Sequence, residues 1–110
     1  MAYNHELAER ISQALVEINS NYSEKKMFGG IGYMVNGNMA CGILGGQLIV
    51  RVGKDAYNAA LSQPGVTEFM NNKRPMVGWV MVHESALSSN KILKEWVAKG
   101  VNFSLSLPGK

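Results

Sequence analysis

The sequence predicts a two-layer α+β domain, with three helices mainly on one face of an antiparallel sheet of about five strands. Tight-turn signals separate apolar runs throughout residues 25–53, which is typical of consecutive hairpins. Three other segments carry apolar residues at helical spacing. The predicted order is α-β-β-β-β-α-β-α. Because the 110 residues are 46% hydrophobic and 17% charged, residues 1–110 fit one domain with one core.

Two dipeptides define the hairpins. Asn36-Gly37 lies between apolar runs and suits a type I′ turn, which needs positive φ at both central residues. Gly45-Gly46 repeats this signal one strand later. Two-residue turns fix the register. The predicted pairs are Val35 with Asn38, Met34 with Met39, Gly32 with Cys41, Leu44 with Gln47, Ile43 with Leu48, and Cys41 with Val50.

Strict alternation of side chains then assigns two faces to these strands. The uncharged set is the expected core face: Gly32, Met34, Met39, Cys41, Ile43, Leu48, Val50 and Val52. The second set is a mixed face: Ile31, Tyr33, Val35, Asn38, Ala40, Gly42, Leu44, Gln47, Ile49 and Arg51.

The remaining elements follow from local patterns. Helices are expected over residues 5–18 after an Asn4 N-cap, over residues 54–62, and from Ser88 or Ser89 onward. Strands are expected over residues 22–28 and 76–83, the latter apolar on both faces and therefore central. Residues 66–75 are expected to form a loop, with at most one helical turn around residues 68–71. After Gly100 the periodicity fits both a strand and a continued helix.

Composition excludes several classes of protein. The net charge of +3 permits contact with nucleic acid without requiring it. The single cysteine excludes an internal disulfide, and no Cys/His cluster has zinc spacing. The uncharged run of residues 27–50 is broken by glycines and polar residues, which argues against a membrane span. We expect no cofactor, no metal, no membrane association and a cytoplasmic location.

Several motifs resemble the N-terminal domain of the TfoX/Sxy family. They are Lys26-Met27-Phe28-Gly29-Gly30-x-Gly32, Val35-Asn36-Gly37-Asn38-Met39, Leu48-Ile49-Val50-Arg51-Val52, Arg74-Pro75-Met76-x-Gly78, Trp96-Val97 and Ser106-Leu107-Pro108. The resemblance implies helices on one face of an antiparallel sheet, and it favours a helix beyond Gly100. It also implies a link to regulators of natural competence and transcription. Longer members carry a second helical domain, and we expect this chain to be a stand-alone member.

The chemically interesting side chains favour structural roles. The two glycine-rich segments lack P-loop spacing and are interpreted as turns and bulges. Cys41 falls on the expected core face, where a thiol is unreactive. His83 and Glu84 are adjacent, so on a strand they would point to opposite faces. The resemblance supplies no catalytic residues, and none are predicted.

Two surfaces remain as candidate sites. The first is a partner surface on the mixed face, predicted to bind a second copy of the chain or another protein, through Met27, Phe28, Ile31, Tyr33, Ile49 and Arg51. The second is an anion or nucleic-acid patch, formed if the basic residues converge: Lys25, Lys26, Arg51, Lys73 and Arg74. The preferred function is therefore a non-catalytic regulatory or protein-interaction domain. Nucleic-acid binding and an enzyme with an unrecognised site are the alternatives.

Overall fold

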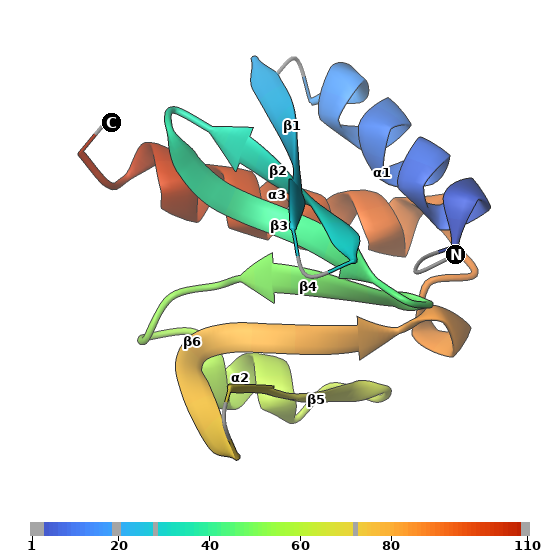
Figure 1. The fold of residues 1–110 in the computed structure, drawn as a ribbon. Helices are drawn as coiled ribbons and strands as arrows, with labels where there is room; N and C mark the ends of the chain where they lie inside the picture. The colour runs from blue at the N-terminus through green and yellow to red at the C-terminus, as the bar shows by residue number, and fades with distance from the viewer. Residues whose placement is uncertain (1–3, 19–20, 28, 72, 109–110) are drawn as a thin grey trace.

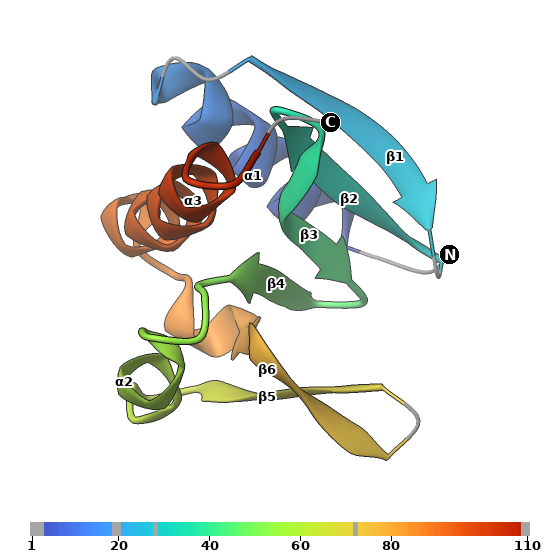
Figure 2. The same cartoon turned by 90° about the vertical axis from the view of Figure 1, so that its left-hand side faces the viewer.

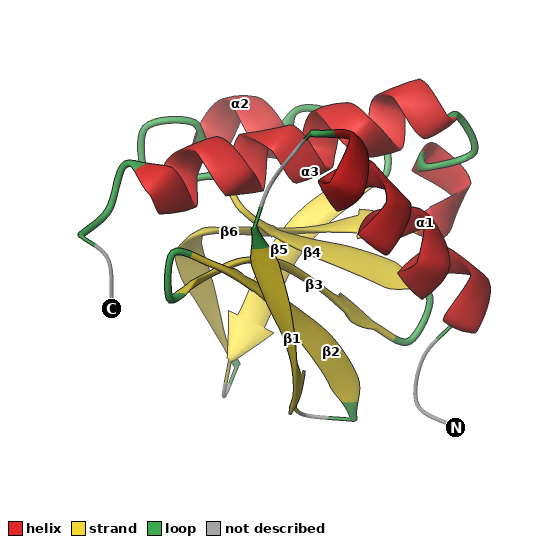
Figure 3. Cartoon of the chain, turned by 90° about the horizontal axis from the view of Figure 1, so that it is seen from above, coloured by secondary structure: helices red, strands yellow, loops and turns green. Residues whose placement is uncertain are grey.

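Three helices cover one face of a six-stranded antiparallel sheet in the computed structural model, which describes residues 4–18, 21–27, 29–71 and 73–108 (Figures 1 and 3). The spatial order of the strands is β1-β2-β3-β4-β6-β5. The α+β prediction is confirmed. The elements are α1 (His5–Glu17), β1 (Tyr22–Met27), β2 (Gly30–Val35), β3 (Asn38–Leu44), β4 (Gln47–Arg51), α2 (Tyr57–Leu61), β5 (Val66–Asn71), β6 (Arg74–His83), the 3-10 turn η1 (Glu84–Ala86) and α3 (Asn90–Leu105).

The sixth strand is β5, which the sequence predicted as a loop. β5 is an edge strand that pairs only with β6, and its register shifts between Glu68 and Met70. Val66 is buried, whereas Thr67, Glu68 and Met70 are exposed. An edge strand with a bulge, in which Val66 alone is buried among residues 66–70, has no clean alternation, so the period-two pattern of a strand is missing.

The helices begin close to where the sequence placed them. Asn4 caps α1 by accepting a hydrogen bond from the Leu7 backbone N–H at 3.1 Å, and Ser89 caps α3. The second helix is shorter than predicted, because α2 begins only at Tyr57 and has no side-chain cap. α3 continues unbroken through Gly100 to Leu105, as the resemblance implied.

The register is correct at both turns and wrong in the middle of the first hairpin. Asn36 and Gly37 have φ of 56° and 79°, as a type I′ turn requires. In the second turn Gly45 alone has positive φ, yet the three predicted β3–β4 pairs form. Between β2 and β3, however, the pairing shifts at Tyr33 and Met34.

That shift is a β-bulge that reverses the predicted faces of β2. Tyr33 pairs with Cys41 while Met34 pairs with Met39, so Ala40 is an additional residue in β3. Gly32 consequently pairs with Gly42, not with Cys41. One additional residue exchanges the two faces beyond it, since side chains alternate with a period of two.

The core lies between the sheet and the helices. β2 contributes Ile31, Tyr33 and Val35 to it, and these side chains are buried with Cys41, Ile43, Leu48 and Val50. The predicted core positions on β3 and β4 are therefore confirmed for those four residues. Met34 and Met39, also predicted for the core, are only half-buried and lie on the opposite face.

Candidate functional site

No helix or strand in the described part of the chain covers the other face of the sheet, here called the open face (Figures 1 and 2). The strand register and side-chain alternation place these residues on it: Lys25, Gly32, Met34, Met39, Gly42, Gln47, Ile49, Arg51, Trp79 and Met81. Figure 2 shows β1 and the β5–β6 hairpin extending beyond the central strands on this side. The sheet edges therefore flank the open face.

The centre of the open face is rich in methionine. Met34 and Met39 are cross-strand neighbours, and Met81 lies opposite Ile49 on the adjoining strands. All three methionines are half-buried, whereas Ile49 is 5% exposed. Methionine is flexible and polarisable, so it is used on surfaces that adapt to a partner. The sequence pattern predicted Met34 and Met39 for the core face instead, and Met81 only as part of a strand that is apolar on both faces.

Arg51 lies at one end of the open face, between Trp79 of that face and Phe103 of α3 in the helix layer. Its guanidinium carbon is 5.2 Å from the ring centroid of Trp79 and 5.3 Å from that of Phe103. Trp79 also contacts Phe69, with ring centroids 6.3 Å apart. Cation–π contacts hold a guanidinium plane while leaving its N–H donors available. Arg51 is thus an ordered, half-exposed cation beside a half-exposed tryptophan.

The structure separates the residues predicted for the partner surface. Ile49 and Arg51 lie on the open face, but Ile31 and Tyr33 face α1 and are buried. The Tyr33 hydroxyl donates to the Ala8 carbonyl at 3.3 Å, and burial raises the pKa of this phenol. The prediction that these four side chains share a face is therefore wrong, because of the Ala40 bulge. Phe28 and the side chain of Met27 lie outside the described residues.

The predicted basic patch is not one cluster. Lys25 pairs with Gly32 and so belongs to the open face, whereas Lys26 pairs with Ile31 and belongs to the helix side. Lys73 and Arg74 lie at the tip of the β5–β6 hairpin, next to the opposite edge of the sheet. Arg51 lies on β4, between these edges. Lys25, Lys73 and Arg74 therefore flank the open face, Arg51 lies between them, and Lys26 does not belong to this face.

The candidate catalytic side chains have structural surroundings. Cys41 is fully buried, and burial raises the pKa of its thiol to about 12. The exposed His83 caps the turn η1, where its Nδ1 accepts from the Ser85 backbone N–H at 3.1 Å. Glu84 accepts from the Asn4 side-chain amide at 3.1 Å. These contacts favour packing and capping roles for Cys41, His83 and Glu84.

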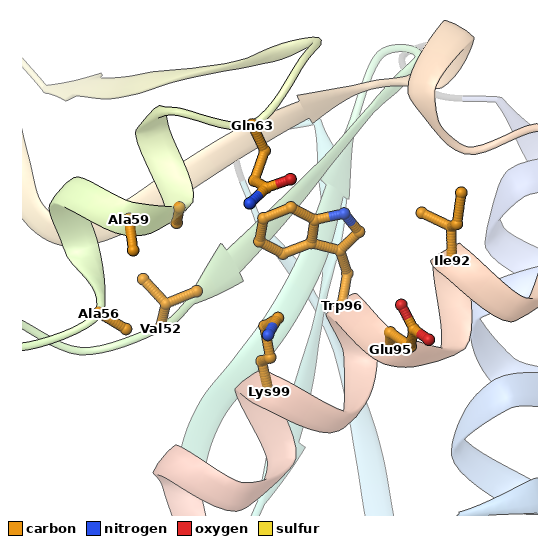
Figure 4. A pocket seen from close by; sticks show the side chains of 9 residues that line it. Val52, Ala56, Ala59, Gln63, Ile92, Glu95, Trp96 and Lys99 are labelled. Atoms are coloured by element: carbon orange, nitrogen blue, oxygen red, sulfur yellow. The ribbon is translucent and has the colours of Figure 1, made fainter.

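A pocket lies on the helix side of the molecule, between α2 and α3 (Figure 4). This pocket of about 420 Å³ is lined by Val52, by alanines of α2 and by Trp96 and Lys99 of α3. No pattern in the sequence indicates this pocket. Only the relative placement of α2 and α3 creates the opening.

No group of three His, Cys, Asp or Glu side chains within residues 4–18, 21–27, 29–71 and 73–108 is arranged to hold a metal ion. Over the same ranges, each helix is too short or too polar to cross a lipid bilayer.

Comparison with known proteins identifies the family. Residues 14–104 match the TfoX N-terminal domain. A search of curated proteins and a search of solved structures each found no match. The match begins within α1 and ends within α3, so it spans the whole sheet and α2. Because it covers most of the 110 residues, the chain belongs to the TfoX N-terminal domain family.

Proposed function

We propose that the protein is a non-catalytic regulatory domain of the cytoplasm, linked to transcription regulation, which acts by binding another protein chain through its open face. The uncovered cluster of Met34, Met39, Met81 and Trp79 is the observation that carries this proposal. Met, Trp and Arg are enriched at the centres of protein interfaces, and the open face combines all three. Family membership supports the link to regulation.

The simplest partner is a second copy of the chain. A two-fold axis places the same surface of both protomers in contact. On the open face the apolar residues are central, whereas Lys25, Lys73 and Arg74 lie towards the edges. A two-fold arrangement can therefore bury the methionines of both copies while these cations stay in solvent. Arg51, held by its two aromatic neighbours, contributes planar donors at the end of the interface.

Sedimentation velocity tests the homodimer. At about 100 μM, well above a typical micromolar dissociation constant, the wild-type chain is expected to sediment at twice its mass of 12.0 kDa. Met34→Lys combined with Met81→Lys places charges at the centre of the interface and should give a monomer. Burying unpaired charges costs several kcal/mol per ion. Both positions are half-buried on a face that no described element covers, so the circular dichroism spectrum should remain that of a folded protein.

Val16→Lys is the matched control, because Val16 is apolar, 60% exposed and belongs to α1 on the helix side. This variant should sediment as the wild type does. A wild-type monomer at about 100 μM would reject the second copy as the partner. Equal loss of mass in the Val16 variant would show that the contact lies elsewhere on the molecule.

Single-stranded nucleic acid is a second candidate ligand of the same face. The supporting observation is the pair Arg51 and Trp79, with Lys25 on one side and the hairpin tip on the other. Bases stack on exposed aromatic rings, and flanking cations contact the phosphates. Fluorescence anisotropy of a labelled single strand at low salt should then show binding that weakens steeply with added salt and that Trp79→Ala reduces. An unchanged anisotropy at micromolar protein would reject this candidate.

A further inference from the structure

The pocket between α2 and α3 has an apolar interior. Val52, Ala60 and Trp96 are each 7% exposed and form its base, while Ala56 and Ala59 line the side formed by α2. The alanines leave room that larger side chains on this short helix would fill. The volume of about 420 Å³ falls within the range of sites that bind small molecules, roughly 300–1,000 Å³.

Three polar side chains line this pocket: Gln63, Glu95 and Lys99. Lys99 places its ammonium nitrogen 5.9 Å from the centroid of the Trp96 ring. Figure 4 shows Gln63 of the α2 side lying across from Trp96, and Glu95 on the side of Trp96 that is nearer Ile92. Among the described residues, no carboxylate lies within ion-pair distance of Lys99. The pocket therefore offers one cation from α3 that has no ion-pair partner among the described residues, and one amide from the chain just after α2.

We propose that this pocket binds a small apolar carboxylate, an aromatic or short-chain organic acid. Its hydrocarbon body would lie between the alanines of α2 and the Trp96 ring, where burial of apolar surface favours binding. Its carboxylate would accept hydrogen bonds from the Lys99 ammonium and the Gln63 amide, and charge-assisted bonds of this kind are the stronger ones. The site lies on the helix side, so it is independent of the open face and of the partner proposed for it.

The two tryptophans make the test internally controlled. In a ¹H–¹⁵N NMR titration of the full chain with phenylacetate, the indole N–H signal of Trp96 should shift and saturate. The expected dissociation constant is on the order of 1 mM or lower, as for a ligand of this size. The indole signal of Trp79, on the opposite side of the sheet, should stay in place. Phenethylamine has the same ring with the opposite charge, and it should bind at least tenfold more weakly.

Single variants test the charge of Lys99 and the space of the cavity separately. Lys99→Gln should weaken phenylacetate binding by about fivefold or more, because a charge-assisted hydrogen bond is lost. Glu95→Gln removes a negative charge that repels the carboxylate of the ligand, so phenylacetate should bind this variant as tightly as the wild type or more tightly. Ala59→Phe should abolish binding by filling the cavity, whereas Asn58→Phe, exposed on the same helix but outside the pocket, should not.

Three results would overturn the proposal. The first is the absence of a saturable Trp96 shift with phenylacetate at concentrations up to about 10 mM, tenfold above the expected constant. The second is equal binding of phenethylamine, which would show that Lys99 does not select the charge. The third is a Trp96 shift that survives in the folded Ala59→Phe variant, which would place the ligand outside this pocket.

Discussion

Cys41 shows how the environment of one residue decides its chemistry. Its strand neighbours Tyr33 and Val50 are 0% exposed, as Cys41 is, and burial without a cationic partner disfavours the thiolate. The pKa of the thiol rises from 9.0 to about 12. A thiol that stays protonated and enclosed is neither a nucleophile nor a redox sensor in the native state.

This shift predicts a loss of stability at alkaline pH. The folded-state pKa lies above the unfolded value, so the native state retains a proton that the unfolded chain releases above about pH 9. The contribution of the Cys41 thiol to the free energy of unfolding is fully present below pH 9. It declines as the pH rises towards 12, by up to about 1.4 kcal/mol per pH unit. Urea unfolding from pH 8 to 11 should show this slope, and Cys41→Ala should reduce it.

A thiol-reactive disulfide reagent should modify native Cys41 at pH 8 no faster than global unfolding allows.

The contact between α3 and β3 sets the spacing of the two layers. Gly100 lies in the middle of α3 and is buried, and a Cβ there would collide with the Ala40 carbonyl oxygen. That obstacle is backbone, so it cannot move aside by a change of rotamer. Glycine in a helix interior costs about 1 kcal/mol relative to alanine, and close approach of the helix to the bulged strand offsets that cost.

Gly100→Ala is therefore expected to destabilise the fold despite the better helix propensity of alanine. Overpacking against backbone typically costs 1–3 kcal/mol, and alanine recovers about 1 kcal/mol of helix propensity, so a net loss of up to about 2 kcal/mol in the free energy of unfolding should appear in urea denaturation. Asn102→Ala, exposed on the same helix, is the control and should be neutral or stabilising by a few tenths of a kcal/mol. Equal stability of Gly100→Ala and wild type would show that α3 can move away from β3.

At the scale of the whole molecule, one core joins every large element. Residues of α1, α3 and the strands β2, β3, β4 and β6 form a single buried cluster, which Tyr57 and Ala60 of α2 and Val66 of β5 also join. The helices and the helix-facing side of the sheet bury their apolar side chains against each other. Loss of one layer would therefore expose the apolar surface of the other.

Unfolding is thus expected to be cooperative, with one transition. Trp79 in β6 reports on the open face, Trp96 in α3 on the helix layer, and far-ultraviolet circular dichroism on the backbone as a whole. Each of the variants Trp79→Phe and Trp96→Phe keeps one tryptophan. In each variant, the urea midpoint measured by the fluorescence of that tryptophan should coincide with the midpoint measured by circular dichroism. A fluorescence midpoint displaced from that curve in either variant would reveal a layer that unfolds separately.

The sequence alone determined the features that depend on short-range chemistry. The Asn36-Gly37 turn needs residues that accept positive φ, the Asn4 and Ser89 caps need side-chain oxygens, and the helix stripes need a period of 3.6. Together they predicted the α+β class, the helix positions to within about three residues, and the pairs next to both turns.

Only the tertiary structure decided which face each residue of β2 occupies. The Ala40 bulge has no local signal, because its benefit appears only when α1 covers β2 and Tyr33 can be buried with its hydroxyl bonded to Ala8. The same holds for β5, whose pairing with β6 compensates for its weak pattern. The open face and the pocket between α2 and α3 are likewise products of packing. Each brings together side chains that are distant in sequence, and no periodicity can show where two elements leave space between them.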